Sequence, residues 1–246
     1  KFNIPYDTKS SKKNILKVLK NKKFADGYFQ KKCQLFIQNK INSKCVELTH
    51  SCSSALEIAM LLINLKKNDE VIMPSYTFVS TANAFVLRGA KPVFIDINVE
   101  NLNIDINQIE KAITKKTKAI VIVHYAGISC EIDKVKKIAK KRNIYLIEDA
   151  AHSILAYYKN KPLGSIGDLA ALSFHDTKNI QCGEGGALLI NNQKFIKRAN
   201  IIKSKGTNRD LFNKNIIKKY SWVDIGSSYA LSEINAAFLF EQLIRS

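Results

Sequence analysis

Short apolar runs rich in β-branched residues alternate with stretches in which apolar residues recur every three or four positions, and this alternation constrains the fold most. The runs predict six strands buried on both faces: Val71–Met73, Pro92–Ile97, Ala119–Val123, Ile144–Ile147, Ala170–Phe174 and Ala187–Ile190. Helices are expected between the first four strands: Thr77–Arg88, Asn107–Ile113 and Ile132–Lys141. Strands that alternate with helices form a mainly parallel sheet with crossover connections. The sequence therefore predicts an α/β fold with helices on both faces of the sheet.

Further helices are expected toward both ends of the chain. They are a basic helix around Lys12–Asn21, amphipathic helices at Tyr28–Ile41 and Leu231–Ile244, and a strong helix at Ser53–Leu65. Hydroxyl residues begin the last of these and can cap it, and Asp26-Gly27 predicts a turn. No internal repeat or low-complexity linker interrupts the 246 residues. We therefore expect one domain over residues 1–246 with an N-terminal helical segment.

The charge of the chain bears on its partners. The formal net charge is +18, with 39 Lys and Arg against 21 Asp and Glu. A clustered basic patch would predict nucleic-acid binding, but these lysines are spread along the chain among many Asn and Ile residues. We therefore expect no nucleic-acid partner, and a basic regulatory protein stays open as an alternative. A basic surface also attracts small anionic substrates.

Two further patterns bear on location and redox state. No apolar run approaches the about 20 residues that span a bilayer, and Lys1–Tyr6 lacks the apolar core of a signal peptide. We expect a cytoplasmic protein without a membrane partner. The five cysteines are odd in number and lack a Cys-x-x-Cys pair, so reduced thiols are expected rather than disulfides or a metal site.

An acid and a lysine follow two of the predicted strands. Asp149 comes at the end of one apolar run, and Lys178 lies just past another. A pyridoxal phosphate enzyme needs such a pair: the lysine amine holds the cofactor aldehyde as a Schiff base, and the carboxylate keeps the pyridine nitrogen protonated. Glu148 points the other way in an extended strand and is expected to be structural. A lone lysine is more often a solvated surface residue, so the surrounding sequence decides.

Lys178 follows Ser173-Phe174-His175 and precedes the turn Gly183-Glu184-Gly185-Gly186. This arrangement resembles the DegT/DnrJ/EryC1/StrS family of nucleotide-sugar aminotransferases. The resemblance covers nearly the whole chain, through Thr49–Leu56, Val71–Phe85, His124–Gly127, Lys205–Arg209 and Trp222–Tyr229. Within the family, these segments are most similar to the dTDP-4-amino-4,6-dideoxygalactose transaminases.

The resemblance implies a fold, a cofactor and an assembly. The fold is the large domain of fold-type I pyridoxal phosphate transferases, with a mainly parallel sheet of the seven-stranded type. The small C-terminal domain that closes the active site in the family is absent from residues 1–246. The cofactor is pyridoxal 5'-phosphate, and the intact protein is expected to be a homodimer.

The resemblance also assigns residues to the cofactor phosphate and ring. Ser53 and Ser54 occupy phosphate-contact positions, for which an ordinary serine N-cap is the alternative. Ser173 is a further phosphate contact. Phe78 stacks on the cofactor ring in the family, and a buried core phenylalanine is the alternative. His152 lies against the phenolic oxygen, and a histidine satisfied at a helix start is the alternative.

The remaining implications concern the substrate and the reaction. His175 is placed near the sugar, with Tyr76 as a weaker substrate-binding candidate. The expected reaction moves an amino group from an amino acid, L-glutamate by resemblance, to a nucleotide-linked 4-keto-6-deoxy sugar such as dTDP-4-keto-6-deoxyglucose, for surface polysaccharide. Lys178 and Asp149 are the catalytic residues. A truncated scaffold without catalysis is the second alternative.

Overall fold

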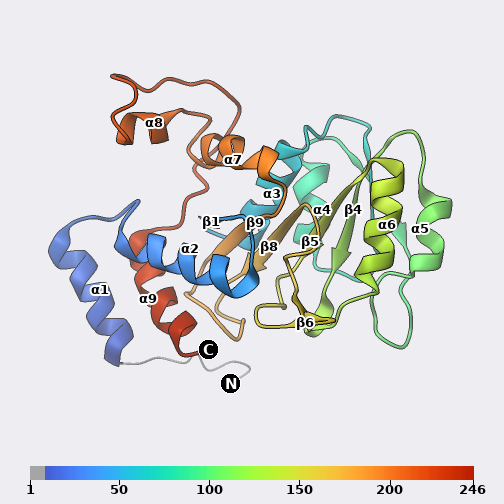
Figure 1. Cartoon of the computed structure of the whole chain (residues 1–246), viewed down its shortest axis with the longest axis horizontal. Coiled ribbons are helices and arrows are strands. Elements are labelled where there is room, and N and C mark those ends of the chain that lie inside the picture. The colour runs from blue at the N-terminus through green and yellow to red at the C-terminus, as the bar shows by residue number, and fades with distance from the viewer. Residues whose placement is uncertain (1–8) are drawn as a thin grey trace.

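Seven strands form one sheet in the computed structural model, which describes residues 9–246 (Figure 1). Their order across the sheet is β1-β9-β8-β5-β4-β2-β3. The bounds are β1 (Cys45–Thr49), β2 (Glu70–Pro74), β3 (Lys91–Ile95), β4 (Thr117–Val123), β5 (Tyr145–Asp149), β8 (Leu169–Ser173) and β9 (Gly186–Ile190). Strand β9 runs antiparallel to β1 and β8, and the other neighbours pair in parallel. The predicted α/β fold with a mainly parallel sheet is confirmed.

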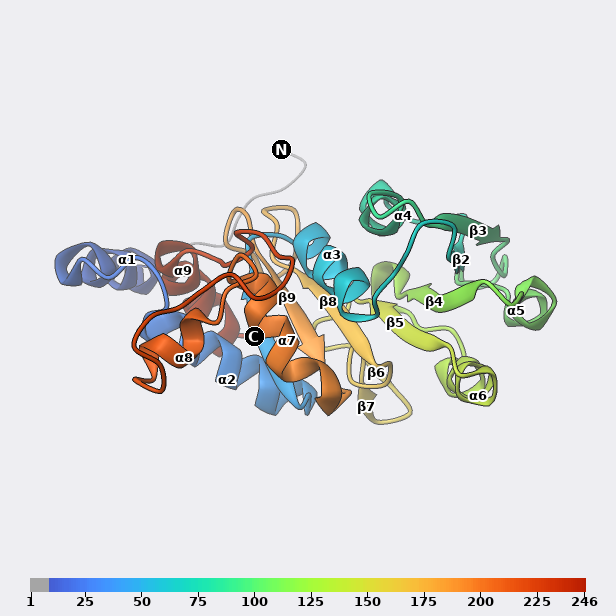
Figure 2. The same cartoon turned by 90° about the horizontal axis from the view of Figure 1, so that it is seen from above.

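Helices cover both faces of the sheet, as Figure 2 shows for α3 and α4 on one side and α6 on the other. The first face packs against α3 (Cys52–Leu62), α4 (Val79–Val86) and α7 (Ile196–Lys203). The second packs against α5 (Ile106–Ala112) and α6 (Ile132–Arg142) at one end, and α2 (Tyr28–Ile41) and α9 (Glu233–Ile244) at the other. Along β5, Leu146 joins the α6 core and Ile147 the α3 core, because successive side chains point to opposite faces.

The sequence missed several elements. Strand β1, the hairpin of β6 (Tyr157–Tyr158) and β7 (Lys161–Pro162), and the helices α7 and α8 (Arg209–Asn213) were not expected. The prediction that β3 is buried on both faces was wrong, because this strand forms the edge of the sheet and its Phe94 is 54% exposed. The expected N-terminal helix is α1 (Lys9–Asn21). Lys1–Tyr6, judged not to be a signal peptide, lies outside the described residues. Within residues 9–246, no helix combines the length and apolarity that a bilayer span requires.

Lys178 lies in the connection between two antiparallel strands rather than before a crossover helix. Ser173 in β8 pairs with Gly186 in β9, so residues 174–185 form the loop that joins them. The Gly-Glu-Gly-Gly segment therefore turns the chain back past Lys178, as the sequence predicted. A Cβ atom on Gly186 would lie 2.5 Å from the backbone nitrogen of Cys52, so only glycine lets β9 approach the start of α3 this closely.

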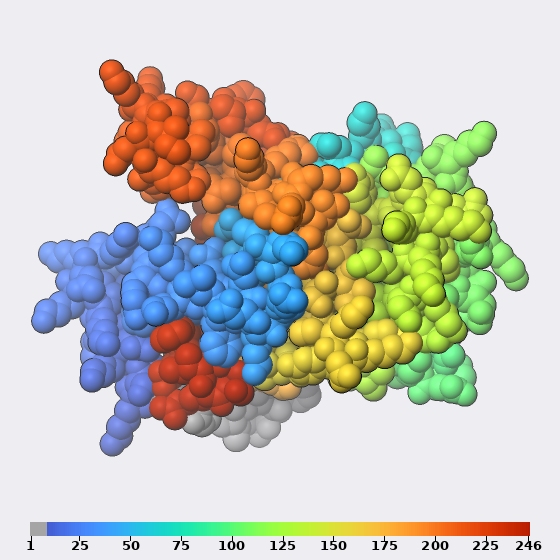
Figure 3. Space-filling model, viewed as in Figure 1, coloured from blue at the N-terminus to red at the C-terminus, as the bar shows by residue number. Residues whose placement is uncertain are grey.

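The segment between α7 and α9 leaves the sheet and stands out at one end of the molecule, where α8 is visible in orange (Figure 3). Arg198 of α7 links the returning end of this segment to α3. Its Nε donates to Asp224 at 2.7 Å, and its Nη1 donates to the carbonyl oxygen of Leu61 at 2.8 Å. Gly206 has φ +72°, and a Cβ there would overlap the carbonyl of Asp224. The segment is thus anchored at its base by an ion pair and by close backbone contacts, among them the N–H groups of Val223 and Asp224 that both donate to the carbonyl oxygen of Gly206.

The N-terminal helical segment is joined to the C-terminal helix by a buried carboxylate. Glu233 begins α9 and is 2% exposed. It accepts the backbone N–H groups of Phe29 at 2.6 Å and Gln30 at 3.1 Å, which are donors of the first turn of α2. These N–H groups have no intrahelical acceptor, so Glu233 caps α2 from another element.

Glu233→Ala is expected to lower the free energy of unfolding by about 1–3 kcal/mol, since two buried N–H groups lose their acceptor. Glu110→Ala, an exposed glutamate on α5, is the control and is expected to change it by less than about 0.5 kcal/mol. Urea unfolding of both variants measures this. Equal changes would show that the α2 cap contributes nothing.

Candidate cofactor site at the carboxyl edge of the sheet

The predicted site residues follow strands that end at one edge of the sheet. Asp149 closes β5, Ser173 closes β8, and Tyr76 and Phe78 follow β2. These strands run parallel through β4, so their carboxyl ends share an edge. This is the edge at which open α/β sheets bind ligands.

Asp149 is buried and keeps acceptor capacity. Its exposed fraction is 5%, Oδ2 accepts the hydroxyl of Thr81 at 2.6 Å, and Oδ1 accepts the N–H of Ala151 at 3.2 Å. The Thr81 hydroxyl in turn lies 2.8 Å from that of Thr77. Because an ionised carboxylate only accepts, the proton order runs from Thr77 to Thr81 to Asp149. Sequence reasoning missed Thr81, although it lies in the first turn of the helix that follows β2.

The amine of Lys178 makes no hydrogen bond and no ion pair with any residue between 9 and 246. Its backbone N–H donates to the carbonyl of His175 at 2.9 Å, which fixes the turn around it. Its charge acts on Cys52 at the start of α3: burial and the Asp149 charge raise the pKa of the Cys52 thiol, while the Lys178 charge lowers it. The structure therefore brings Lys178 and Asp149 into the same electrostatic environment at the start of α3.

Hydroxyl groups surround the N-terminus of α3, but not all of them as predicted. Ser51, not Ser53 or Ser54, is the N-cap, and its hydroxyl accepts the N–H of Ser54 at 3.1 Å. The Ser54 side chain is buried and lies 2.8 Å from the Ser51 oxygen, so its hydroxyl is already engaged. Ser53 donates to Ser80 of α4 at 2.8 Å. The serine-cap alternative for Ser53 and Ser54 is therefore wrong.

Aromatic side chains line the edge next to Asp149. The Tyr76 and Tyr125 rings are 4.6 Å apart, and the Tyr125 ring meets that of His152 edge-on at 5.6 Å. Phe78 is 73% exposed at the start of α4, so the alternative of a buried core phenylalanine is wrong. An exposed ring at this edge is available to a planar ligand.

His152 is oriented by the turn that follows β4. Its Nδ1 accepts the backbone N–H of Ala126 at 3.2 Å. Burial lowers the pKa of His152 below 6.5, the nearby Lys178 charge lowers it further, and Asp149 opposes the shift. The ring is therefore neutral near pH 7, and since Nδ1 accepts, Nε2 carries the proton.

Ser173 and His175 lie on either side of the β8 end. Ser173 is buried, and its hydroxyl accepts the N–H of His175 at 3.4 Å. His175 is partly exposed between two acids: Nδ1 lies 2.9 Å from Asp176, and Nε2 lies 3.5 Å from Glu184. The structure thus places Ser173 at the carboxyl edge of the sheet, with His175 beside it between two acids.

These residues match the chemistry of pyridoxal phosphate. A phosphate needs N–H and hydroxyl donors, which the start of α3 and Ser53 supply. A pyridinium nitrogen needs a buried anion, and Asp149 retains capacity to accept one more donor. An aldehyde needs an amine without another partner, and the Lys178 amine has no such partner within the described part of the chain. The residues present fit the cofactor.

Two substitutions are expected to shift the pKa of His152 in opposite directions. Lys178→Ala is expected to raise it toward its ordinary value, because a nearby positive charge is removed, while Asp149→Asn is expected to lower it. NMR titration of His152 in cofactor-free protein measures both. Shifts of the same sign in the two variants would contradict the arrangement.

The same depressed pKa implies a pH dependence of stability. The unfolded chain takes up the proton first, so the His152 contribution to the free energy of unfolding is complete above about pH 6.5. It falls as the pH drops from there toward the folded pKa.

Comparisons with known proteins identify the family of the chain. A family model described as the DegT/DnrJ/EryC1/StrS aminotransferase family matches residues 5–246. The uncharacterized protein MJ1066 of Methanocaldococcus jannaschii is 40% identical over 233 residues, which cover 93% of this chain and 60% of that protein. The chain therefore spans only part of the length of its relatives.

Solved structures show the same fold. Helicobacter pylori PseC, an aminotransferase involved in the biosynthesis of pseudoaminic acid, superposes with a TM-score of 0.90 at 31% identity, over 100% of this chain and 65% of that one. The apo form of Spr1654, a putative sugar aminotransferase from Streptococcus pneumoniae, gives 0.92 at 26% identity, over 100% and 66%. Its PLP and PMP forms match as well. With the family model spanning nearly every residue, the chain belongs to the DegT/DnrJ/EryC1/StrS aminotransferase family, whose cofactor is pyridoxal phosphate.

Proposed function

We propose that this chain is the cofactor-binding large domain of a sugar aminotransferase. The observation that carries the proposal is the Lys178 amine, which has no hydrogen-bond or ion-pair partner among residues 9–246 and lies in the electrostatic field of Asp149, a buried carboxylate with acceptor capacity to spare. A structural lysine in such a place would be paired with the acid. The small domain is proposed to lie in the part of the protein beyond this segment, since the chain covers 60% of the archaeal relative.

Each site residue has a proposed role. Bound pyridoxal phosphate supplies an electron sink for the charge that develops on the substrate carbon. Lys178 would hold the cofactor covalently until a substrate amine displaces it, and the freed Nζ would then be the base that takes up the proton at the substrate Cα. Asp149 holds the proton on the ring nitrogen. His152 would donate from Nε2 to the phenolic oxygen of the cofactor, and Phe78 would stack on the cofactor ring.

The phosphate is proposed to bind at the start of α3. Ser53, Ser54 and Ser173 are the proposed side-chain donors, with the free N–H groups of the first helical turn. The engaged hydroxyl of Ser54 implies that it acts by exchanging its Ser51 partner for phosphate. His175 and Tyr76 are proposed to face the sugar.

For the substrate, we propose an amino acid donor, L-glutamate, and a nucleotide-linked 4-keto-6-deoxy sugar acceptor. The support is the resemblance around Met73–Phe78 and Trp222–Ile225 to the 4-amino-4,6-dideoxygalactose branch. A structural neighbour, GDP-4-keto-6-deoxymannose-3-dehydratase with bound GDP-perosamine, handles a nucleotide sugar of related type. Basic residues are proposed to hold the diphosphate. The product would serve surface polysaccharide synthesis in the cytoplasm, and the protein would act as a homodimer.

Lys178→Ala is expected to abolish the visible absorption band of the protein supplied with pyridoxal phosphate. Borohydride reduction of the unsubstituted protein is expected to fix the cofactor on Lys178, as peptide mass spectrometry reads out. Lys194→Ala, at the opposite edge of the sheet, is the control and is expected to keep the band. A label recovered on another lysine, or an absence of any band, would favour the scaffold alternative.

The full-length protein is expected to convert L-glutamate and dTDP-4-keto-6-deoxyglucose to 2-oxoglutarate and a 4-amino sugar, and to turn over 3-keto isomers poorly. The physical reason is that a bound diphosphate fixes which sugar carbon meets the cofactor amine. NMR of the product measures the position of the amine. An amine at C3 would contradict the sugar assignment and leave aminotransfer intact.

A further inference from the structure

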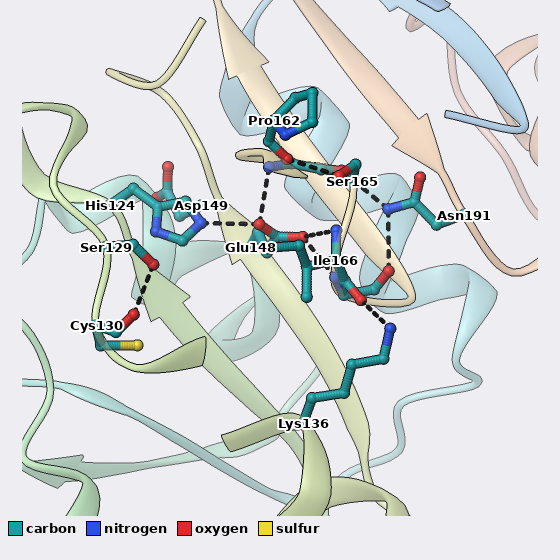
Figure 4. A network of polar contacts seen from close by, with 12 residues as sticks. His124, Ser129, Cys130, Lys136, Glu148, Asp149, Pro162, Ser165, Ile166 and Asn191 are labelled. Carbon is teal, nitrogen blue, oxygen red and sulfur yellow. Dashed lines mark hydrogen bonds and ion pairs between the residues drawn. The ribbon is translucent and has the colours of Figure 1, made fainter. Parts of the chain in front are cut away.

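Glu148 is buried on the face of β5 opposite to Asp149, in the network of Figure 4. Its Oε1 accepts the backbone N–H groups of Ile166 at 2.8 Å and Gly167 at 2.5 Å. Its Oε2 accepts the N–H of Gly164 and Nε2 of His124, each at 2.8 Å. Four donors therefore occupy the four acceptor positions of one carboxylate. The structural role predicted for Glu148 agrees with this geometry.

The hydrogen bonds determine where the proton of His124 lies. Burial raises the pKa of Glu148, but the hydrogen bond and charge of His124 and the N–H groups of Gly167 and Gly164 outweigh it and hold the pKa below its ordinary value. An ionised carboxylate only accepts, so Nε2 of His124 carries a proton. Both side chains of this pair are 0% exposed, so the ring is held in one orientation.

His124 also contacts the residue on the other face of the strand. Its backbone N–H donates to the carbonyl oxygen of Asp149 at 3.0 Å. His124 thus hydrogen-bonds to two consecutive residues of β5: its ring contacts Glu148, and its backbone N–H contacts Asp149. Because a strand alternates its side chains, a shift of Glu148 moves the Asp149 carboxylate on the opposite face.

The chain that follows His124 leads directly to His152. Residues Tyr125–Gly127 form a tight turn in which Ala126 has φ +52°. The Ala126 N–H is the donor that reaches Nδ1 of His152. The His124 ring fixes the start of this turn. The two hydrogen bonds of His124 with Glu148 and Asp149, which we call the His124 clamp, therefore hold Asp149 and also set the position of the Ala126 donor.

We propose that His124 is a positioning residue that orients two cofactor-facing groups at once: the carboxylate of Asp149, through β5, and the proton on Nε2 of His152, through the Tyr125–Gly127 turn. His124 itself lies on the far side of the strand from Asp149. The effect on the cofactor rests on the proposed function, whereas the clamp is a property of the chain alone.

Three variants at position 124 and one control separate positioning from stability. Gln can place an amide N–H where Nε2 lies and still donate to Glu148, whereas Ala cannot, and Asn is too short to reach it. Glu47→Gln is the control, because Glu47 of β1 forms the other described buried ion pair, with Lys203 of α7, away from β5. It is expected to lower the melting temperature without moving Asp149 or His152.

The first measurement uses cofactor-free protein labelled with ¹⁵N-histidine, in which the ring nitrogen shifts report the tautomer. Unsubstituted protein, His124→Gln and Glu47→Gln are expected to show His152 protonated on Nε2. His124→Ala is expected to show nearly averaged shifts of the two His152 nitrogens, because the Ala126 donor is no longer held. An unchanged His152 tautomer in His124→Ala overturns the proposal. If that variant does not fold, His124→Asn takes its place.

The second measurement uses protein supplied with pyridoxal phosphate. His124→Ala is expected to weaken cofactor binding by about tenfold or more and to shift the pH midpoint of its visible band, since small misplacements of charged groups have large effects. His124→Gln is expected to restore both, and Glu47→Gln to stay within about twofold. Equal effects of Glu47→Gln and His124→Ala would overturn the proposal. Absence of cofactor binding in unsubstituted protein would instead refute the proposed function, and the histidine spectra would still decide the clamp.

Discussion

Two consecutive buried carboxylates at the end of β5 are the constraint on which the site depends. A strand alternates its side chains, so Glu148 and Asp149 enter opposite layers of the fold, and both are nearly inaccessible to solvent. An ion removed from water costs several kcal/mol unless donors replace the water. Glu148 receives four donors, while Asp149 receives two. The satisfied acid is structural, and the acid with spare capacity is the one that can bind a cationic ligand group.

The strands and helices that a sequence can reveal are those with a clean pattern. The bounds of helices α2 and α6 were predicted within one residue, since their apolar positions recur at helical spacing. An Asn with left-handed backbone angles forms the C-cap of each helix. Strand β1 was missed because Glu47 interrupts its apolar run, and the buried partner of that acid, Lys203, lies 156 residues away. The return of β9 past Lys178 was predicted from its glycine turn, and the lack of a helical pattern between Ser173 and Gly186 agrees with the antiparallel pairing of β8 and β9.

The same distinction applies to the candidate site: residues with a local sequence signal could be predicted, and residues placed by contacts between elements could not. Asp149 and Lys178 could be predicted as candidates because each follows an apolar strand within a recognisable run of residues. Thr81 and His124 were missed because their roles arise from contacts between elements, 68 residues away from Asp149 in one case and 24 residues away from Glu148 in the other. The sequence predicts phosphate donors at the start of α3, with a cap at Ser53 or Ser54 as the alternative. The cap is Ser51, because three neighbouring serines compete for that position and only the extended backbone angles of Ser51 suit it.

Exposed apolar groups give the proposed homodimer a physical motive that is independent of resemblance. Phe78 and Val79 are 73% and 63% exposed at the start of α4, and Trp222 is 80% exposed in the segment between α7 and α9. Exposed apolar side chains mark interaction surfaces when they form a contiguous patch, and Phe78 and Val79 are neighbours in the chain. Val79 begins the same helix that carries Thr81 to Asp149, so a partner that covered Val79 and left the Phe78 ring to the cofactor would lie beside the edge of the site. Cofactor binding and association are therefore expected to favour each other, because both act on the first turn of α4.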